Sequence, residues 1–181
     1  MEDVQIALGK ALDKVTLGDP RLKEVRMGSL IDKNQVEAVK KSILELSKTA
    51  ELVYGDFDKA KTIGADYAKG AFMKPILLRE NHPFENEAAH ITEAFGPVST
   101  LMPYKTLEDA IKLSKKGKGS LVSSIFTNSD IIARDYTIQA ASHHGRILSI
   151  NRESAKQSTG HGAPLPNLVH GGPGRAGGGE E

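Results

Sequence analysis

Segments with helical and strand patterns alternate along most of the chain, and this alternation constrains the fold more than any other feature. The spacing of apolar residues predicts helices over 33–48 and 131–142 and strands over 97–104, 121–126 and 146–150. Strands that are joined by helices of this length form parallel pairs with right-handed crossovers. We therefore predict the α/β class, with an open, mainly parallel sheet and helices on both of its faces.

Local signals place the remaining elements. An apolar stripe from Val4 to Val15 predicts a helix, residues 51–54 predict a short strand, and residues 72–78 predict an edge or irregular strand because they contain Pro75. Expected helix caps are Asp32, Thr106 with Asp109 in a capping box, and Ser129 or Asp130, while Gly145 is expected to close the helix over 131–142. The inward face of the helix over 33–48 is predicted to be Val36, Val39, Ile43, Leu44 and Leu46.

The composition excludes several classes of protein. The 181 residues suit one domain, and 24 basic against 23 acidic residues leave a net charge of +1, without the basic surplus that nucleic-acid binding requires. No apolar run has the length of a membrane span, so we expect neither a nucleic-acid nor a membrane partner. The chain has no Cys, which excludes disulfides and thiolate metal sites and favours a cytoplasmic protein.

Residues 152–181 differ in composition from the rest, since they are rich in Gly, Ser and Pro. Such a segment is either a loop shaped around a ligand or a disordered tail. Gly172–Gly177 fits G-x-G-x-x-G, but no strand pattern precedes it and no helix pattern follows it, so we interpret it as a permissive loop. None of the six His has zinc-site spacing, and His143 and His144 are expected at a helix end, where imidazolium complements the dipole. No metal is predicted.

The segment Glu93–Val98 places a carboxylate and an aromatic ring in a loop directly before a predicted strand. Gly96 and Pro97 restrict the backbone there, so both side chains have set directions. A carboxylate can accept hydrogen bonds from the two hydroxyls of a ribose, and a ring can pack on a nicotinamide. The spacing alone is more typical of a surface Glu beside a core Phe.

Glu93–Val98 resembles the E-x-F-G-P motif of the aldehyde dehydrogenase superfamily. Other segments resemble family motifs in the same order: Leu17–Pro20 (G-D-P), Met27–Ile31 (M-G-P-L-I), Leu107–Ile111 (the helix after the E-x-F-G-P strand), Ser124–Thr127 (A-x-V-F-T) and Gly145–Asn151 (G-x-V-x-V-N). The resemblance covers nearly the whole chain. It implies that residues 1–151 are part of a catalytic domain of this family, in its carboxyl-terminal half, and that 152–181 are a Gly/Pro-rich pocket loop or tail.

The resemblance implies roles for five residues. Glu93 matches the ligand of the ribose hydroxyls, Phe95 the residue that packs near the nicotinamide, and Gln35 a cofactor-contacting Gln. Asn151 and His170 match the lining of the aldehyde pocket. Ala38 stands where the family has a cofactor-contacting Lys, which weakens that part of the contact. His170 replaces the usual Phe, which suggests a more polar wall.

The segment Gly160–Gly179 is most similar to the branch of the family that forms part of bifunctional enzymes of bacterial phenylacetate degradation. That similarity implies NADP or NAD as cofactor, a CoA-linked semialdehyde as substrate, and a homo-oligomer. The family's nucleophilic Cys and base Glu precede this segment, so no catalytic residue is expected here, and the chain alone is predicted to be inactive. Two alternatives stay open: a stand-alone structural or oligomerisation module, and part of a CoA-acylating aldehyde dehydrogenase or acyl-CoA reductase.

Overall fold

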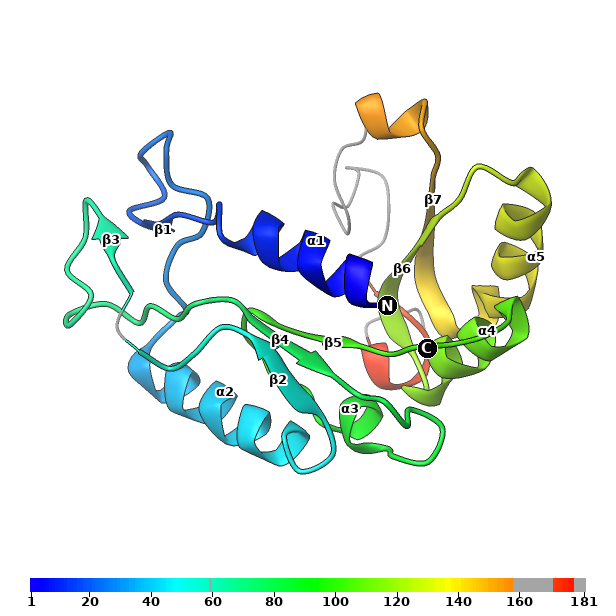
Figure 1. The fold of residues 1–181 in the computed structure, drawn as a ribbon, viewed down its shortest axis with the longest axis horizontal. Coiled ribbons are helices and arrows are strands. Elements are labelled where there is room, and N and C mark those ends of the chain that lie inside the picture. Colours follow the sequence, from blue (N-terminus) through cyan, green and yellow to red (C-terminus); the bar gives the residue numbers. More distant parts are fainter. Residues whose placement is uncertain (59, 158–170, 178–181) are drawn as a thin grey trace. The chain divides into compact units, whose positions relative to one another are not determined.

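The computed structural model of the chain describes residues 1–58, 60–157 and 171–177 (Figure 1). These residues belong to two compact units that divide between Pro103 and Tyr104, and each unit is described by itself. Among the described strands, three of the four pairs are parallel, and helices and strands alternate along the chain. The predicted α/β class with mainly parallel pairing is therefore confirmed, although the strands form three small open sheets in place of one.

The first unit contains α1 (Glu2–Leu12), β1 (Leu17–Gly18), α2 (Lys33–Leu46), β2 (Glu51–Tyr54), β3 (Thr62–Ile63), β4 (Ile76–Arg79), α3 (Ala88–Ile91) and β5 (Val98–Leu101). Its larger sheet has the order β2-β4-β5, antiparallel between β2 and β4 and parallel between β4 and β5. Of the two alternatives for residues 72–78, an edge or an irregular strand, the edge position is wrong, because β4 is central. Pro75 lies just before the strand, and the ladder begins with Ile76, whose N–H donates to the Pro97 carbonyl at 2.9 Å.

Helix α2 covers one face of this sheet and contributes three of the seven buried residues of its core cluster. It begins at Asp32, whose Oδ1 accepts a hydrogen bond from the Gln35 N–H at 2.7 Å, as the capping pattern predicts. Its buried residues Val39, Ile43 and Leu46 pack against Ile76 and Leu78. Leu44 is 62% exposed, which contradicts its place in the predicted inward face. Each residue turns the helix by about 100°, so Leu44 lies far from the stripe that its three buried neighbours form.

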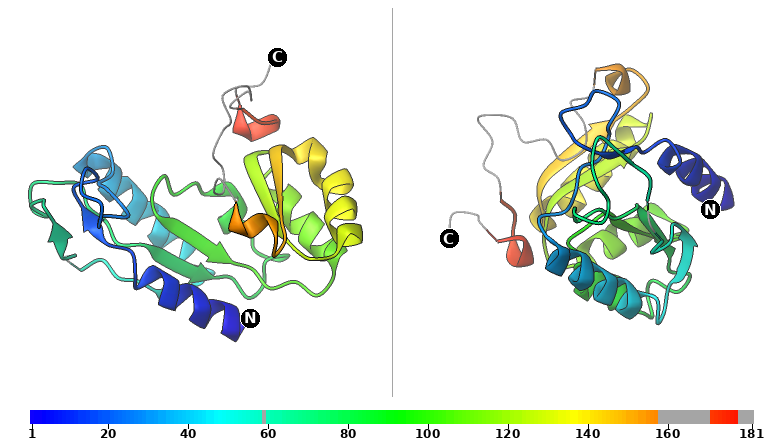
Figure 2. Two further views of the ribbon diagram at one scale, coloured as in Figure 1. Left: turned by 90° about the horizontal axis from the view of Figure 1, so that it is seen from above. Right: turned by 90° about the vertical axis from the view of Figure 1, so that its left-hand side faces the viewer.

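Helix α1 lies against the other face of the same sheet. The Arg79 guanidinium donates to Gln5 of α1 at 3.4 Å, and the Tyr54 ring lies beside Gly9. Figures 1 and 2 show α1 and α2 on opposite sides of the β2-β4-β5 sheet. The prediction of helices on both faces is confirmed for this unit.

The second unit contains α4 (Leu107–Lys116), β6 (Ser120–Phe126), α5 (Asp130–Ala140), η1 (Ala141–His143), β7 (His144–Ile150), η2 (Ser154–Lys156) and η3 (Gly174–Ala176). Strands β6 and β7 are parallel, and the core joins Ile111 of α4 and Tyr136 of α5 to Ile125 and Ile147 of the strands. Both helices therefore cover the same face of β6 and β7. The predicted caps are confirmed, with a full capping box at Thr106 and the Ser129 hydroxyl accepting from Ile132.

Two expectations fail where α5 ends. The helix stops at Ala140, and Gly145 lies inside β7, so Gly145 does not close the helix. His144 is the first residue of β7 and is only 7% exposed, and its Nδ1 lies 2.6 Å from the Ser120 hydroxyl oxygen. Burial, the largest cause, lowers the pKa of His144, with smaller contributions from His143 and Lys115. Since a lowered pKa favours the neutral ring, His144 does not act as the predicted imidazolium at a helix end.

Residues 171–177 lie against the amino ends of β6 and β7. A side chain at Gly145 would place its Cβ 1.9 Å from the Gly171 carbonyl oxygen, and one at Gly172 would lie 2.4 Å from the Ser120 oxygen. The Arg175 N–H donates to the Lys118 carbonyl at 3.1 Å. Gly172 and Gly174 of the G-x-G-x-x-G match thus permit close backbone packing, as expected for a loop, and the segment ends in the short turn η3. Residues 158–170 and 178–181 of the predicted loop or tail lie outside the described residues.

Candidate functional site

The loop between α3 and β5 carries the two residues that the sequence singles out most clearly, Glu93 and Phe95. Its backbone is folded into two successive tight turns, because the Gly96 N–H donates to the Ala94 carbonyl at 2.7 Å and the Val98 N–H donates to the Gly96 carbonyl at 2.8 Å. The Phe95 ring is 72% exposed, so it is not the core Phe of the alternative interpretation. The loop turns its carboxylate and its ring towards solvent.

One face of α2 lies directly behind this loop. The Gln35 side-chain amide donates to the Phe95 carbonyl at 2.8 Å, and the Ser42 hydroxyl lies 3.5 Å from the Glu93 carbonyl. A side chain at Gly96 would meet the Val39 methyl group at 2.7 Å, so only Gly allows the loop to approach this closely. The structure therefore brings the predicted residues Gln35, Glu93 and Phe95 together, although Gln35 meets the backbone of the loop. A direct contact of Gln35 with the cofactor stays a prediction.

The chemistry of the side chains in this loop fits the nicotinamide ring of a nicotinamide cofactor and the ribose attached to it. Glu93 is exposed, and within the described part of the chain no group bonds to its carboxylate, so both oxygens can accept from vicinal hydroxyls. Phe95 offers an exposed apolar surface beside it. The position differs from the expectation for open parallel sheets, where ligands bind beyond the carboxyl ends of strands. The loop lies at the amino ends of β4 and β5, since Ile76 pairs with Val98 there.

In the second unit, Asn151 follows the carboxyl end of β7 and organises the turn after it. Its Oδ1 accepts from the N–H groups of Glu153 at 3.0 Å and Ser154 at 2.9 Å, and its own N–H donates to the Ser154 hydroxyl. These bonds engage the side-chain oxygen of Asn151 in starting η2. The place of Asn151 in the lining of the aldehyde pocket, which the family resemblance implies, stays a prediction. His170, the other predicted pocket residue, lies outside the described residues.

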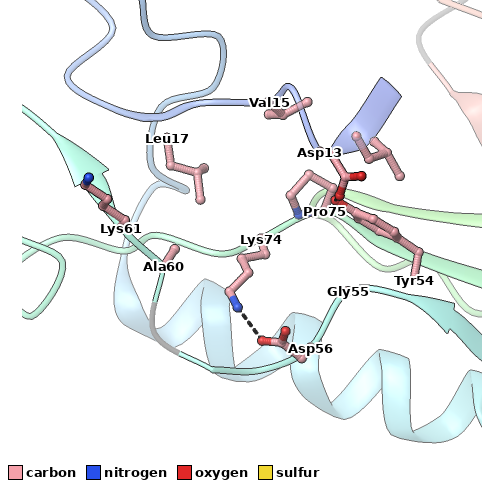
Figure 3. Close-up of a pocket in the computed structure, with 11 residues that line it drawn as sticks. Asp13, Val15, Leu17, Tyr54, Gly55, Asp56, Ala60, Lys61, Lys74 and Pro75 are labelled. Carbon is pink, nitrogen blue, oxygen red and sulfur yellow. Dashed lines mark hydrogen bonds and ion pairs between the residues drawn. The ribbon is translucent and has the colours of Figure 1, made fainter. Parts of the chain in front are cut away.

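A separate cavity of about 440 Å³ opens in the first unit, and its lining includes none of the predicted residues Gln35, Glu93 and Phe95 (Figure 3). Two pairs of its polar groups are bonded to each other: Lys74 Nζ lies 2.5 Å from Asp56 Oδ1, and the Tyr54 hydroxyl donates to Asp13 at 2.9 Å. The hydrogen bond from Lys74 lowers the pKa of Asp56, and burial together with Asp13 raises the pKa of Tyr54. The sequence gives no motif for this cavity, because its lining comes from three segments that are far apart along the chain.

Two classes of site are not found in the part of the chain that the structure describes. No group of three or more His, Asp or Glu side chains there is arranged to hold a metal ion. No helix among these residues combines the length and the apolar character that crossing a membrane requires.

Comparisons with known proteins give a consistent family. The model of the aldehyde dehydrogenase family matches residues 1–164. The chain is 46% identical over 157 residues to Protein MaoC of Klebsiella aerogenes, a match that covers 86% of this chain and 45% of that protein. It is 33% identical over 157 residues to the 3,4-dehydroadipyl-CoA semialdehyde dehydrogenase of Aromatoleum evansii, covering 87% of this chain and 30% of that enzyme. The chain therefore spans less than half the length of these relatives.

Solved structures agree in fold. The succinic semialdehyde dehydrogenase of Streptococcus pyogenes, solved with NADP+ as the cofactor, superposes with a TM-score of 0.76 and 23% identity over 98% of this chain and 35% of that chain. The betaine aldehyde dehydrogenase of Staphylococcus aureus, solved with NAD+, gives a TM-score of 0.79 with 17% identity over 97% of this chain and 32% of that chain. At these identities the likeness shows the fold alone.

Proposed function

The chain belongs to the aldehyde dehydrogenase family, and from this premise we propose that it forms the carboxyl-terminal part of the catalytic domain of an NAD(P)-dependent enzyme that oxidises an aldehyde to the acid. In this proposal residues 1–151 belong to the catalytic domain, and residues 152–181 contribute a loop that lines the aldehyde pocket. The loop that carries Glu93 and Phe95 is the main support, because it presents a carboxylate and an apolar ring from a tightly held backbone.

Each proposed site residue has a task that its chemistry allows. The Glu93 carboxylate accepts hydrogen bonds from the ribose hydroxyls, and the Phe95 ring packs beside the nicotinamide. Asn151 and His170 line the path of the aldehyde, with the Asn151 side-chain nitrogen as a donor. A bound NAD(P) supplies the acceptor for the hydride. The chain has no Cys, so it holds no thiol for the covalent step of the family's reaction.

A CoA-linked semialdehyde is the proposed substrate, and phenylacetate catabolism is the proposed context. The relative from Aromatoleum evansii supports the substrate class, since its name refers to a CoA-linked semialdehyde. NADP is the proposed cofactor, with NAD as the alternative. We also propose that the whole enzyme is cytoplasmic and assembles as a homo-oligomer.

The experiment uses the chain itself and separates binding from turnover. Backbone amide resonances are recorded by NMR while NADP+, and in a second series NAD+, is added at millimolar concentration. We expect weak binding, with shifts concentrated at Glu93, Phe95 and Gly96, and we expect Glu93→Gln to reduce them. A parallel assay with a reactive aldehyde should show no NADPH formation, because the nucleophile is missing.

Two results would overturn the proposal. Turnover by the chain would show that its chemistry does not depend on a Cys. Shifts that avoid the loop around Glu93 for both cofactors would remove the assigned cofactor residues.

A further inference from the structure

One face of α2 holds the backbone of the Glu93–Gly96 loop at three points. Gln35, Val39 and Ser42 are spaced by four and three residues, which places them on the same side of the helix. The Gln35 amide meets the Phe95 carbonyl, Val39 packs against Gly96, and the Ser42 hydroxyl lies by the Glu93 carbonyl. We call these three residues the α2 brace.

The brace acts on the part of the loop that decides where Phe95 points. The direction of a side chain depends on the two peptide planes on either side of its Cα atom. The peptide plane that precedes Phe95 contains the Ala94 carbonyl, which accepts a hydrogen bond from the Gly96 N–H at 2.7 Å. The peptide plane that follows Phe95 contains the Phe95 carbonyl, which accepts a hydrogen bond from the Gln35 side-chain amide at 2.8 Å. Both planes are therefore pinned, and the exposed ring of Phe95 leaves the loop in one direction.

We infer that Gln35 is a positioning residue of the cofactor site, which aims Phe95 through the loop backbone. Val39 and Ser42 complete this role, the first by packing against Gly96 and the second through the Glu93 carbonyl. This inference rests on the proposed function for the identity of the site. The bond to the Phe95 carbonyl engages one of the two N–H donors of the Gln35 amide, so the direct cofactor contact that the family resemblance implies stays a separate prediction.

Gln35→Glu separates the two roles, because it preserves size and oxygen acceptors but removes the N–H donor. A Gln35 that binds ribose hydroxyls through its oxygen would keep that contact after the change. A Gln35 that positions the loop would lose its bond to the Phe95 carbonyl, and the new carboxylate would repel that oxygen. Protonating the introduced carboxyl at acid pH restores a donor, so a positioning role predicts recovery of the loop as the pH falls.

The test measures hydrogen exchange of the Gly96 and Val98 amides by NMR in the chain without any cofactor. Gln35→Glu should speed the exchange of both amides about tenfold near neutral pH, the size expected for losing one such bond. The excess should disappear at acid pH, after correction for intrinsic exchange. Asn34→Asp is the matched control, since it makes the same amide-to-acid change at the neighbouring, exposed position and should leave both rates unchanged. Thermal unfolding of the variants checks that the fold is intact.

The outcomes distinguish this inference from the proposed function. Faster exchange that recovers at acid pH supports the positioning role, whether or not NADP+ perturbs the loop. Exchange that is the same in Gln35→Glu and Asn34→Asp overturns it, even if the parent chain binds NADP+ through Glu93. An increase that does not recover on acidification also overturns it, because it would reflect a general disturbance of α2.

Discussion

Gly145→Ala tests how residues 171–177 are attached to the second unit. The added Cβ would lie 1.9 Å from the buried Gly171 carbonyl oxygen and 2.9 Å from the Gly172 Cα, whereas ordinary contacts begin at 3.4 Å. Segment 171–177 must therefore move away from β7 by at least about 1.5 Å. A shift of that size breaks the hydrogen bond from the Arg175 N–H to the Lys118 carbonyl, which is 3.1 Å long in the parent chain.

The magnitude follows from these contacts. Forcing an extra carbon into a packed site costs about 1–3 kcal/mol, and one lost hydrogen bond accounts for about 0.5–1.5 kcal/mol of that. Since 1.4 kcal/mol is a factor of about ten, the Arg175 amide should exchange roughly 5- to 150-fold faster in Gly145→Ala. The amides of β6 and β7 should keep their protection, because only the attachment of the segment is lost. Hydrogen exchange resolved by residue gives the exchange rate of the Arg175 amide and those of the β6 and β7 amides in one measurement.

Gly117→Ala is the control, because the same substitution at that position should stabilise the chain and not destabilise it. A Cβ at Gly117 meets nothing within 4 Å, and the residue has helical φ and ψ angles of −68° and −7°. Replacing Gly by Ala at such a site stabilises by about 0.4–1 kcal/mol through the unfolded chain. If the Arg175 amide exchanged at the same rate in Gly145→Ala as in the parent chain, the close approach of Gly171 to β7 would be refuted.

Two further predictions concern the core and its pH dependence. Leu78→Ala should lower the free energy of unfolding by about 2–5 kcal/mol because Leu78 is fully buried. Leu44→Ala, at a 62% exposed position, should change it by less than about 0.5 kcal/mol. Urea unfolding compares the two variants, and equal losses of stability would contradict the assignment of Leu44 to the exposed face of α2. The pKa of His144 in the folded chain is lowered below its usual 6.5. On acidification, His144 is therefore protonated in the unfolded chain before it is protonated in the folded chain. The stability that the neutral ring contributes should be fully present above pH 6.5 and should be lost as the pH falls below it. Unfolding free energies across this range should show the loss, and a His144→Gln variant with an unchanged pH dependence would exclude His144 as its source.

Features with a local cause could be predicted from the sequence. The caps at Asp32, Thr106 and Ser129 are correct because each is a hydrogen bond to a backbone N–H three residues away. The errors have long-range causes. The apolar pattern of α2 includes Leu44, but only the position of the sheet decides which side of the helix is buried. Gly145 fits a helix end by type, whereas its real constraint is the Gly171 backbone, which comes from a distant part of the chain.

The candidate site shows the same division. The motif around Glu93 and Phe95 could be found because its residues are adjacent, and the exposure of the Phe95 ring then distinguishes it from a core Phe. The bond between Gln35 and Phe95 joins residues 60 positions apart, and neither residue type signals the other. The sequence therefore identifies the exposed side chains of the loop, but not the residues that hold its backbone in place.

This arrangement bears on why the chain should bind a cofactor weakly. A loop that must be ordered on binding loses conformational entropy, which reduces its affinity. Here the backbone of Glu93–Gly96 is held by α2, a helix of the same unit, so the loop is already ordered before any ligand arrives. Weak binding would then reflect the small number of contacts that Glu93 and Phe95 provide, and not a misfolded loop. Gln35→Glu separates these causes, because it disturbs the order of the loop and leaves the Glu93 and Phe95 side chains unchanged.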